Sequence, residues 1–147
     1  APMMIFAPGR KGNGEASQQI VEFVDLYPTV ASLCGLTPPT TVEGKSIVPL
    51  LDRPSKSWRG TAFTQVLRPG DGIPVMGASI RTDRWRYTEW NEGEQGIELY
   101  DHSNDPGEFD NLASKPKFAE IISDLRKKLR ANVSGKVPDS PFNPAML

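Results

Sequence analysis

The chain has 147 residues, and its 17 Lys and Arg nearly balance its 18 Asp and Glu, which gives a formal net charge of −1 at pH 7. We expect no nucleic-acid partner, because proteins that bind polynucleotides need a basic excess to displace counterions from the phosphates. No apolar run approaches the roughly 20 residues that cross a bilayer, so no membrane partner is expected, and the one cysteine excludes an internal disulfide framework and an all-cysteine zinc site.

The first forty residues predict one half of an α/β layer. Residues 3–7, MMIFA, form a short apolar run that is typical of a strand buried on both faces. A helix is predicted over about 26–34, with Asp25 as its cap and Gly35 just after its end. Its apolar residues recur at intervals of three and four: Leu26, Val30, Leu33 and Cys34. This face should therefore cover an apolar surface, and Cys34 should belong to the core.

Residues 41–60 are predicted to form a linker with at most one helical turn, at 49–51. From Thr61 the pattern changes to a period of two, which predicts a four-stranded antiparallel sheet. The first strand is TAFTQVL, the second begins at about Met76, the third is WRYTEW, and the fourth is IELY at 97–100.

The stretch 79–90, SIRTDRWRYTEW, mixes arginines with large aromatic residues, a composition that also suits a groove for single-stranded nucleic acid. Asp83 and Arg84 can instead form the tight turn of a hairpin. The two faces of its second arm carry Trp85, Tyr87 and Glu89 on one side and Arg86, Thr88 and Trp90 on the other. Because the pleat divides the arginines and the aromatics between two faces, we interpret the stretch as a hairpin.

The clearest helix is predicted over about 117–133, with Pro116 at or near its first position. Its apolar residues repeat at helical spacing: Phe118, Ile121, Ile122, Leu125, Leu129 and Val133. Such a helix should lay one apolar face on the sheet. Residues 135–147, with three prolines, should form an extended tail. The predicted fold class is α+β: an antiparallel sheet packed by a long C-terminal helix and preceded by one strand and one helix.

Residues 97–113, IELYDHSNDPGEFDNLA, resemble the signature near the carboxyl end of sulfatases, in which Leu-Tyr-Asp is followed by Asp-Pro-x-Glu-x-x-Asn-Leu-Ala. Four other stretches resemble successive blocks of the same family in the same order: PMMIFAPG, VDLYPTVASLCGL, EGKSIVPLL and SIRTDRWRYTEW. The stretch 65–69 and the Tyr-Thr-Glu-Trp ending look closest to the iduronate-2-sulfatase branch. The resemblance implies membership of the alkaline-phosphatase-like superfamily.

The resemblance also implies where the chemistry belongs. In sulfatases a cysteine within Cys-x-Pro-x-Arg becomes formylglycine, whose hydrate attacks sulfur, while Asp and Asn side chains hold calcium. The Cys-x-Pro-x-Arg motif does not occur in this sequence, because its one cysteine, Cys34, is followed by Gly-Leu-Thr. The chain then resembles a carboxyl-terminal fragment, with residues 1–40 as a remnant of the catalytic domain and 61–134 as the C-terminal subdomain. We expect it to hold no catalytic residue, no metal and no cofactor, and to be inactive alone.

The parent protein, by the same resemblance, should hydrolyse a sulfated sugar or another sulfate ester in a periplasmic, secreted or lysosome-like compartment. The expected partner of this chain is the missing N-terminal catalytic domain. A second possibility is an autonomous, non-catalytic binding or assembly module derived from a sulfatase subdomain. In either case a chain that begins with residues 3–7 should expose an apolar patch and a strand edge, through which homo-oligomers could form.

Gln65 and Arg68 are the candidate substrate-binding residues, because the resemblance suggests that this subdomain borders the mouth of the substrate pocket. Arg68 could recognise a carboxylate or a second sulfate on an anionic sugar, since a guanidinium group forms bidentate hydrogen bonds with such groups. It could equally lie in a solvated turn, because glycines and prolines surround it. The sequence leaves both interpretations open.

Other polar residues near the carboxyl-end signature are better explained by local structure. His102 could face a substrate anion, but its neighbours favour a hydrogen-bonded turn. Arg81 and Arg86 could clamp sulfate, but pairing with acidic turns is favoured. The carboxylates that could suggest calcium are Asp101, Asp105, Glu108 and Asp110. They lack the spacing of an EF-hand loop, and we interpret them as turn and cap residues.

Overall fold

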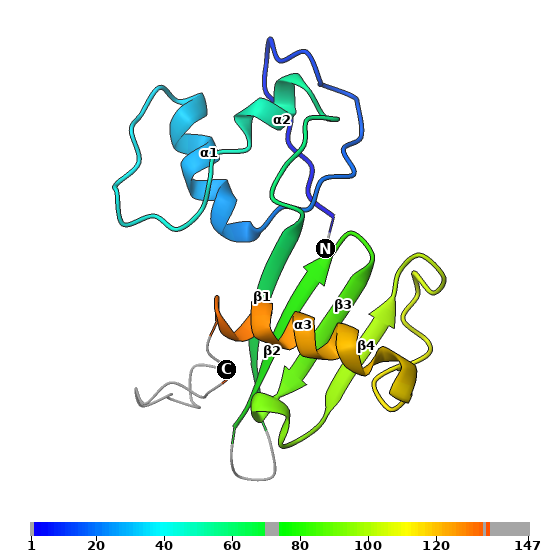
Figure 1. Ribbon diagram of the computed structural model, residues 1–147. Helices are drawn as coiled ribbons and strands as arrows, with labels where there is room; N and C mark the ends of the chain where they lie inside the picture. The colour runs from blue at the N-terminus through cyan, green and yellow to red at the C-terminus, as the bar shows by residue number, and fades with distance from the viewer. Residues whose placement is uncertain (1, 70–73, 134, 136–147) are drawn as a thin grey trace. The chain divides into compact units, whose positions relative to one another are not determined.

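The computed structural model describes residues 2–69, 74–133 and 135. The chain divides into two compact units, Ala1–Ala62 and Phe63–Leu147 (Figure 1). The first contains two helices and long connecting segments, and the second contains a sheet and a helix. Among the described residues no helix is long and apolar enough to cross a membrane.

The strand predicted at 3–7 does not form, which corrects the prediction. Residues 2–7 are extended but pair with no other strand in the described part of the chain. Met4 and Phe6 are 96% and 77% exposed, instead of being buried on both faces. The pattern of apolar residues was strand-like, but a strand needs a neighbour to take up its backbone hydrogen bonds. Here the bonds to Ala7 come from a turn: Asn13 bonds its carbonyl at 2.6 Å and its amide at 3.3 Å, and the amide of Arg10 donates to the same carbonyl at 3.2 Å.

The helix predicted over 26–34 is confirmed as α1, Leu26–Leu33, which follows a short 3-10 turn, η1, at Phe23–Asp25. The apolar stripe of α1 is not buried among the described residues, because the buried residues of the helix are Pro28, Thr29 and Ala31. The hydroxyl of Thr29 donates to the carbonyl of Asp25 and accepts the amide of Ile47 at 2.9 Å. The bond from Ile47 fixes the rotation of α1, with Thr29 inward and the apolar stripe outward.

The same rotation leaves Cys34 exposed, so its assignment to the core is also wrong. The single helical turn expected at 49–51 is confirmed as α2, Val48–Asp52. Residues 41–60 are bonded to the first forty residues at several points, for example from the amide of Gly12 to the carbonyl of Leu51 at 2.8 Å.

The second unit contains the predicted four-stranded antiparallel sheet, in the order β1-β2-β3-β4. Its strands are β1 at Thr61–Arg68, β2 at Val75–Thr82, β3 at Trp85–Trp90 and β4 at Ile97–Asp101. The hairpin between β2 and β3 is confirmed, with Ile80 opposite Tyr87. Its turn has no glycine; instead, the hydroxyl of Thr82 accepts the amide of Trp85 at 2.9 Å. Between β3 and β4 lies a 3-10 turn, η2, at Asn91–Gly93.

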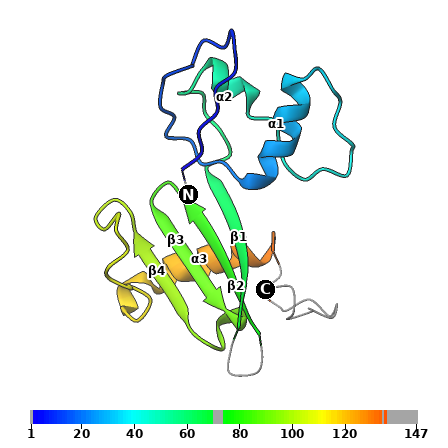
Figure 2. The ribbon, with the colours of Figure 1, turned by 180° about the vertical axis from the view of Figure 1, so that it is seen from behind.

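The predicted C-terminal helix is confirmed as α3, Ala119–Arg130, which follows a 3-10 turn, η3, at Pro116–Phe118. The helix lies across one face of the sheet (Figure 1), and the view from behind shows the opposite face of the strands, without α3 in front of it (Figure 2). The core between sheet and helix contains Ala78, Ile80, Tyr87, Leu99, Ile122, Leu125 and Leu129. The extended tail predicted for 135–147 lies outside the described residues except for Gly135.

Candidate functional site

The face of the sheet turned away from α3, here called the outer face, carries two of the candidate arginines, Arg81 and Arg86. Since Ile80, Tyr87 and Leu99 point into the core under α3, their neighbours in sequence point to the outer face. The register between strands then fixes which of them are adjacent. The outer face comprises Val75, Gly77, Ser79, Arg81, Arg86, Thr88, Trp90, Glu98 and Tyr100.

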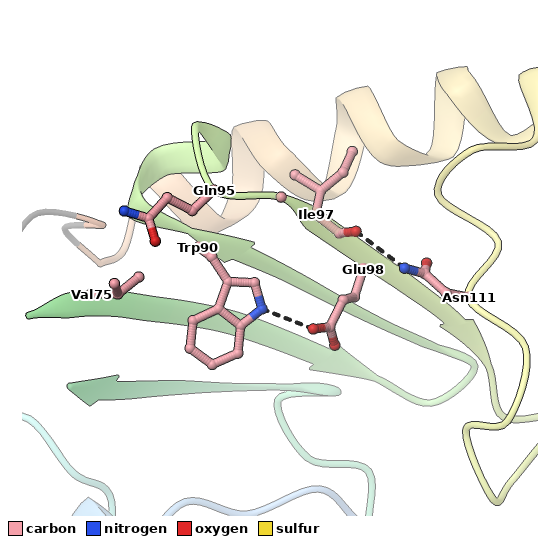
Figure 3. Close-up of a pocket in the computed structure, with 7 residues that line it drawn as sticks. Val75, Trp90, Gln95, Ile97, Glu98 and Asn111 are labelled. Carbon is pink, nitrogen blue, oxygen red and sulfur yellow. Dashed lines mark hydrogen bonds between the residues drawn. The ribbon is translucent and has the colours of Figure 1, made fainter. Parts of the chain in front are cut away.

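An open pocket of about 410 Å³ lies at one end of the sheet, next to η2. Its described lining consists of Val75, Trp90, Gln95, Gly96, Ile97, Glu98 and Asn111. The indole Nε1 of Trp90 donates to Oε1 of Glu98 at 2.8 Å, and Asn111 donates to the carbonyl of Ile97 at 3.2 Å (Figure 3). The pocket therefore combines one aromatic ring with hydrogen-bonding groups held in place by their own bonds.

Gly77 allows the ring of Trp90 to lie against the sheet. A Cβ atom built on Gly77 would stand 2.6 Å from Cζ3 of Trp90 and 3.0 Å from Cγ1 of Val66. Any larger residue would displace the indole, which explains a glycine inside a strand. The alternation along the third strand placed Trp90 on the correct face but did not reveal the pocket. Gly77, which lies opposite Trp90 in the hairpin, was the feature of the sequence that could have indicated it.

The structure places both predicted substrate-binding residues, Gln65 and Arg68, in the exposed second half of β1. They differ by three positions, so the pleat directs them to opposite faces of the sheet. Gln65 shares its face with Phe63, which packs against the core under α3. Arg68 shares its face with Val66, which lies beside Trp90 across Gly77. Arg68 is thus on the outer face, at the end of the sheet that carries the pocket, and Gln65 is not.

The local explanation of His102 and Arg86 is confirmed by their contacts with Glu108. Nε2 of His102 lies 2.6 Å from Oε1 of Glu108, and Nη1 of Arg86 donates to both carboxylate oxygens at 2.9 and 2.7 Å. Among the described residues Arg81 has no acidic partner of this kind; its guanidinium donates to the carbonyl of Thr82. Burial and the neighbouring charge of Arg86 lower the pKa of Arg81.

Two of the four carboxylates of the carboxyl-end signature, Asp101 and Asp105, bond nearby turn residues, as predicted. Asp101 accepts bonds from Nε and Nη2 of Arg84 at 2.9 and 2.7 Å and from the amide side chain of Asn104 at 2.8 Å. The Arg84 bonds hold the pKa of Asp101 well below its usual range. Asp105 accepts the amide of Asp110 at 2.9 Å, and this bond lowers the pKa of Asp105.

These carboxylates are therefore engaged with protein donors and do not form an oxygen cage for a hard cation. In the described part of the chain no group of three or more His, Cys, Asp or Glu residues could hold a metal ion. Cys34 lies outside a Cys-x-Pro-x-Arg motif, so it does not fit the formylglycine position either. No chemical step through calcium or formylglycine can be assigned to residues of this chain.

Comparison with known proteins gives consistent matches. Residues 1–134 match the family model described as "N-sulphoglucosamine sulphohydrolase, C-terminal". Arylsulfatase K of Bos taurus is 30% identical over 139 residues, which are 90% of this chain and 25% of that protein. Delta 4,5-hexuronate-2-O-sulfatase of Bacteroides thetaiotaomicron is 30% identical over 131 residues, 87% of this chain and 27% of that protein.

A solved structure described as a 2-O GAG sulfatase has the same fold, with a TM-score of 0.63 and 34% sequence identity. The similarity covers 73% of this chain and 23% of that one. The chain thus spans about a quarter of the length of the relatives that it matches.

Proposed function

Because the chain belongs to the family of N-sulphoglucosamine sulphohydrolase C-terminal domains, we propose that it serves as the carboxyl-terminal part of a longer sulfuric ester hydrolase. The observation that carries this proposal is the match over residues 1–134, which covers the first compact unit and most of the second. In the proposed arrangement this chain supplies packing and part of the rim of the substrate pocket. The nucleophile, expected to be formylglycine, and a calcium ion would belong to the rest of the protein.

The proposed substrate is a sulfated sugar, and among these a 2-O-sulfated hexuronate. One relative is named a hexuronate-2-O-sulfatase, and a structural relative is described as a 2-O GAG sulfatase. These names support the branch suggested by the resemblance to iduronate-2-sulfatase. A periplasmic, secreted or lysosome-like compartment is part of the same proposal.

The exposed apolar surface of the first unit supports a packing role. The exposure predicted for residues 3–7 and for the apolar stripe of α1 is confirmed for Met4, Phe6, Leu26 and Val30, which are 36 to 96% exposed. Four further apolar side chains of this unit are 50 to 67% exposed: Phe23, Val24, Tyr27 and Leu36. Soluble proteins rarely leave so many large apolar side chains in water without a partner. We propose that the remainder of the longer protein covers η1 and α1. Self-association of the isolated chain through residues 3–7 stays a prediction.

The proposed activity is tested by assaying the longer protein and this 147-residue chain side by side on an aryl sulfate and on a 2-O-sulfated hexuronate disaccharide. We expect sulfate release by the longer protein and none by the chain alone, because the chain lacks the nucleophile motif. Sulfate release by the chain alone would overturn the assignment of roles. A folded longer protein without activity on any sulfate ester would favour the alternative of a binding or assembly module.

Arg68 gives a more specific prediction about the pocket rim. In the longer protein, Arg68→Ala is expected to raise KM for the anionic disaccharide by about tenfold and to change kcat by less than about twofold. This result is expected when a lost contact stabilises the bound substrate and the transition state equally. Gln65→Ala tests the second candidate, which the pleat places on the other face. Lys127→Ala is a matched control, since Lys127 is an exposed cation on α3. Unchanged kinetics in Arg68→Ala would remove Arg68 from the site.

A further inference from the structure

We propose that the pocket on the outer face is a sugar-binding subsite that takes one uncharged or amine-bearing pyranose ring, with Trp90 as its stacking surface. The inference rests on the proposed function for its biological role and adds to it the part of the substrate that carries no sulfate. The described lining of the pocket belongs to this chain, so the subsite can be tested on the chain itself.

The first support is the fixed position of the aromatic ring. The Trp90 indole lies over Gly77, where a Cβ atom would be 2.6 Å from Cζ3 and 3.0 Å from Cε3 of the ring. Its Nε1 is bonded to Glu98 at 2.8 Å, so rotation about the side-chain torsions is restricted (Figure 3). A ring that is already held loses little conformational freedom when a ligand stacks on it. One face of a pyranose carries mainly C–H groups, an apolar surface that packs well on an aromatic ring.

The second support is the set of polar groups beside the ring. Sugar hydroxyls need hydrogen-bond partners when they leave water. The side chain of Gln95 and the carboxylate of Glu98 both border the pocket (Figure 3) and can bond hydroxyl or ammonium groups. Asn111 serves a different purpose, because its Oδ1 already accepts the amides of Leu99 and Ala113, each at 3.0 Å. Asn111 therefore shapes the wall, while Gln95 and Glu98 are the groups that would contact the ligand.

The third support is charge, which selects the kind of sugar. The described lining residues include one carboxylate, that of Glu98, and no cation. A sulfated or carboxylated ring in this pocket would face an anion at short range, which costs free energy in a partly dry site. A neutral ring, or one with an ammonium group, meets no such repulsion. The sulfate-bearing ring is therefore expected outside this pocket, and Arg68, on the same face and at the same end of the sheet, is a candidate to meet it.

The size of the pocket agrees with a single ring. A volume of about 410 Å³ lies at the lower end of the range for small-ligand pockets, roughly 300 to 1,000 Å³. Such a small contact area predicts weak binding by one monosaccharide, with a dissociation constant on the order of 1 mM. In a longer substrate this subsite would add to the contacts made elsewhere, so weak binding is compatible with a role in positioning.

The test is a titration of the 147-residue chain, followed by the indole N–H signal of Trp90 in a two-dimensional NMR spectrum. The probes are methyl glucosaminide, its N-acetyl form and its N-sulfo form. We expect the first two to shift the Trp90 signal with dissociation constants in the millimolar range, and the anionic N-sulfo form to bind at least about fivefold more weakly. Trp90→Phe identifies the signal by its loss.

Trp90→Ala should weaken binding of methyl glucosaminide by about tenfold, because the stacking surface is removed. Trp85→Phe should leave it unchanged, because Trp85 packs edge-on against Phe118 on the α3 side, with ring centroids 5.8 Å apart. Gln95→Ala, at an exposed turn, weakens binding without touching the core, so it keeps the test valid should Trp90→Ala fail to fold. An unshifted Trp90 signal, equal binding of the N-sulfo form, or unchanged binding in Gln95→Ala would overturn the inference.

The two proposals fail separately. Sulfate release by the longer protein, with no sugar binding at Trp90, would reject the subsite and keep the sulfatase. Sugar binding at Trp90 in a family member whose longer form releases no sulfate would reject the hydrolase and keep the subsite.

Discussion

Glu89→Ala is expected to destabilise the second unit by about 3 kcal/mol, because Glu89 is a buried polar link between the sheet and α3. Its carboxylate is 1% exposed. It accepts the hydroxyl of Tyr87 at 2.7 Å, Nε of Arg126 at 2.8 Å and Nε of Arg130 at 2.9 Å. Without it the fully buried Tyr87 hydroxyl keeps only Arg126, itself a donor, as a neighbour. The arginines are 40 and 46% exposed and regain water, which limits the loss.

The measurement is the free energy of unfolding from denaturant titration, monitored through the aromatic side chains of the sheet. Glu120→Ala is the matched control, since Glu120 is an exposed carboxylate in the first turn of α3 and should change stability by less than about 0.5 kcal/mol. If the two variants lost the same free energy of unfolding, the buried hydrogen bonds of Glu89 would contribute no more than an exposed carboxylate does.

The same network predicts how stability depends on pH. Burial opposes ionisation of Glu89, but hydrogen bonds from Arg130, Tyr87 and Arg126 outweigh it, so the pKa of Glu89 is lowered overall. A carboxyl whose pKa is lower in the folded state stabilises the fold at neutral pH, and this contribution is lost as the pH falls below roughly 4. In Glu89→Gln the acid-induced loss should be smaller. At the alkaline end, burial and Glu89 raise the pKa of Tyr87 to about 12, so its contribution is lost as the pH rises above roughly 10.

The sequence predicted those features of the fold that depend on neighbouring residues, and it did not predict contacts between residues far apart in the chain. Alternation along 85–90 placed Glu89 on the face of Trp85 and Tyr87, which is correct. It could not show that this carboxylate would be buried and bonded, because its partners Arg126 and Arg130 are 37 and 41 residues away. The apolar spacing of 117–133 predicted both the helix and its packing, since periodicity is a local property.

The predictions that failed, and the pocket that was missed, share a physical cause: each depends on a contact with a distant residue that the local sequence pattern does not identify. The stripe of Leu26 and Val30 is apolar, yet the helix buries Thr29, because a hydrogen bond from the distant amide of Ile47 fixes its rotation. Residues 3–7 have the composition of a buried strand, but strand formation depends on a neighbouring strand. The Trp90 pocket depends on Gly77, which meets the indole only after the hairpin has closed.

Asp25→Ala is expected to cost the first unit about 4 kcal/mol, the larger of the two losses, because three separate segments meet at this carboxylate. Asp25 is fully buried. Its Oδ2 accepts the amide of Glu22 at 3.0 Å, and its Oδ1 accepts the amide of Lys45 at 2.8 Å and Nη2 of Arg59 at 2.7 Å. Arg59, whose side chain is 21% exposed, also pairs with Glu22. Alanine would leave two backbone amides and a largely buried guanidinium without an acceptor from Asp25.

The close approach at this point makes compensation difficult. A Cβ atom on Gly44 would stand 1.9 Å from the carbonyl oxygen of Val24, so the backbone at 44–45 is already pressed against the turn before α1. Because the two segments already touch, they cannot move closer to offer the unpaired amides another acceptor, and the cost of unpaired donors should be felt. Hydrogen exchange at the amides of Glu22 and Lys45 is the direct measurement: both should exchange faster in Asp25→Ala by a factor of about 100 or more.

Asp52→Ala provides the matched control, because Asp52 is also paired with an arginine in the first unit but at the surface. Nη1 of Arg10 lies 3.0 Å from Asp52, and the two side chains are 32 and 40% exposed. A pair so exposed is worth about 1 kcal/mol or less, so exchange at Glu22 and Lys45 should scarcely change. If Asp25→Ala protected these amides as well as Asp52→Ala does, the carboxylate would not be what holds the segments together. The turn at Glu22–Asp25 would then have to be held by the packing of α1 alone.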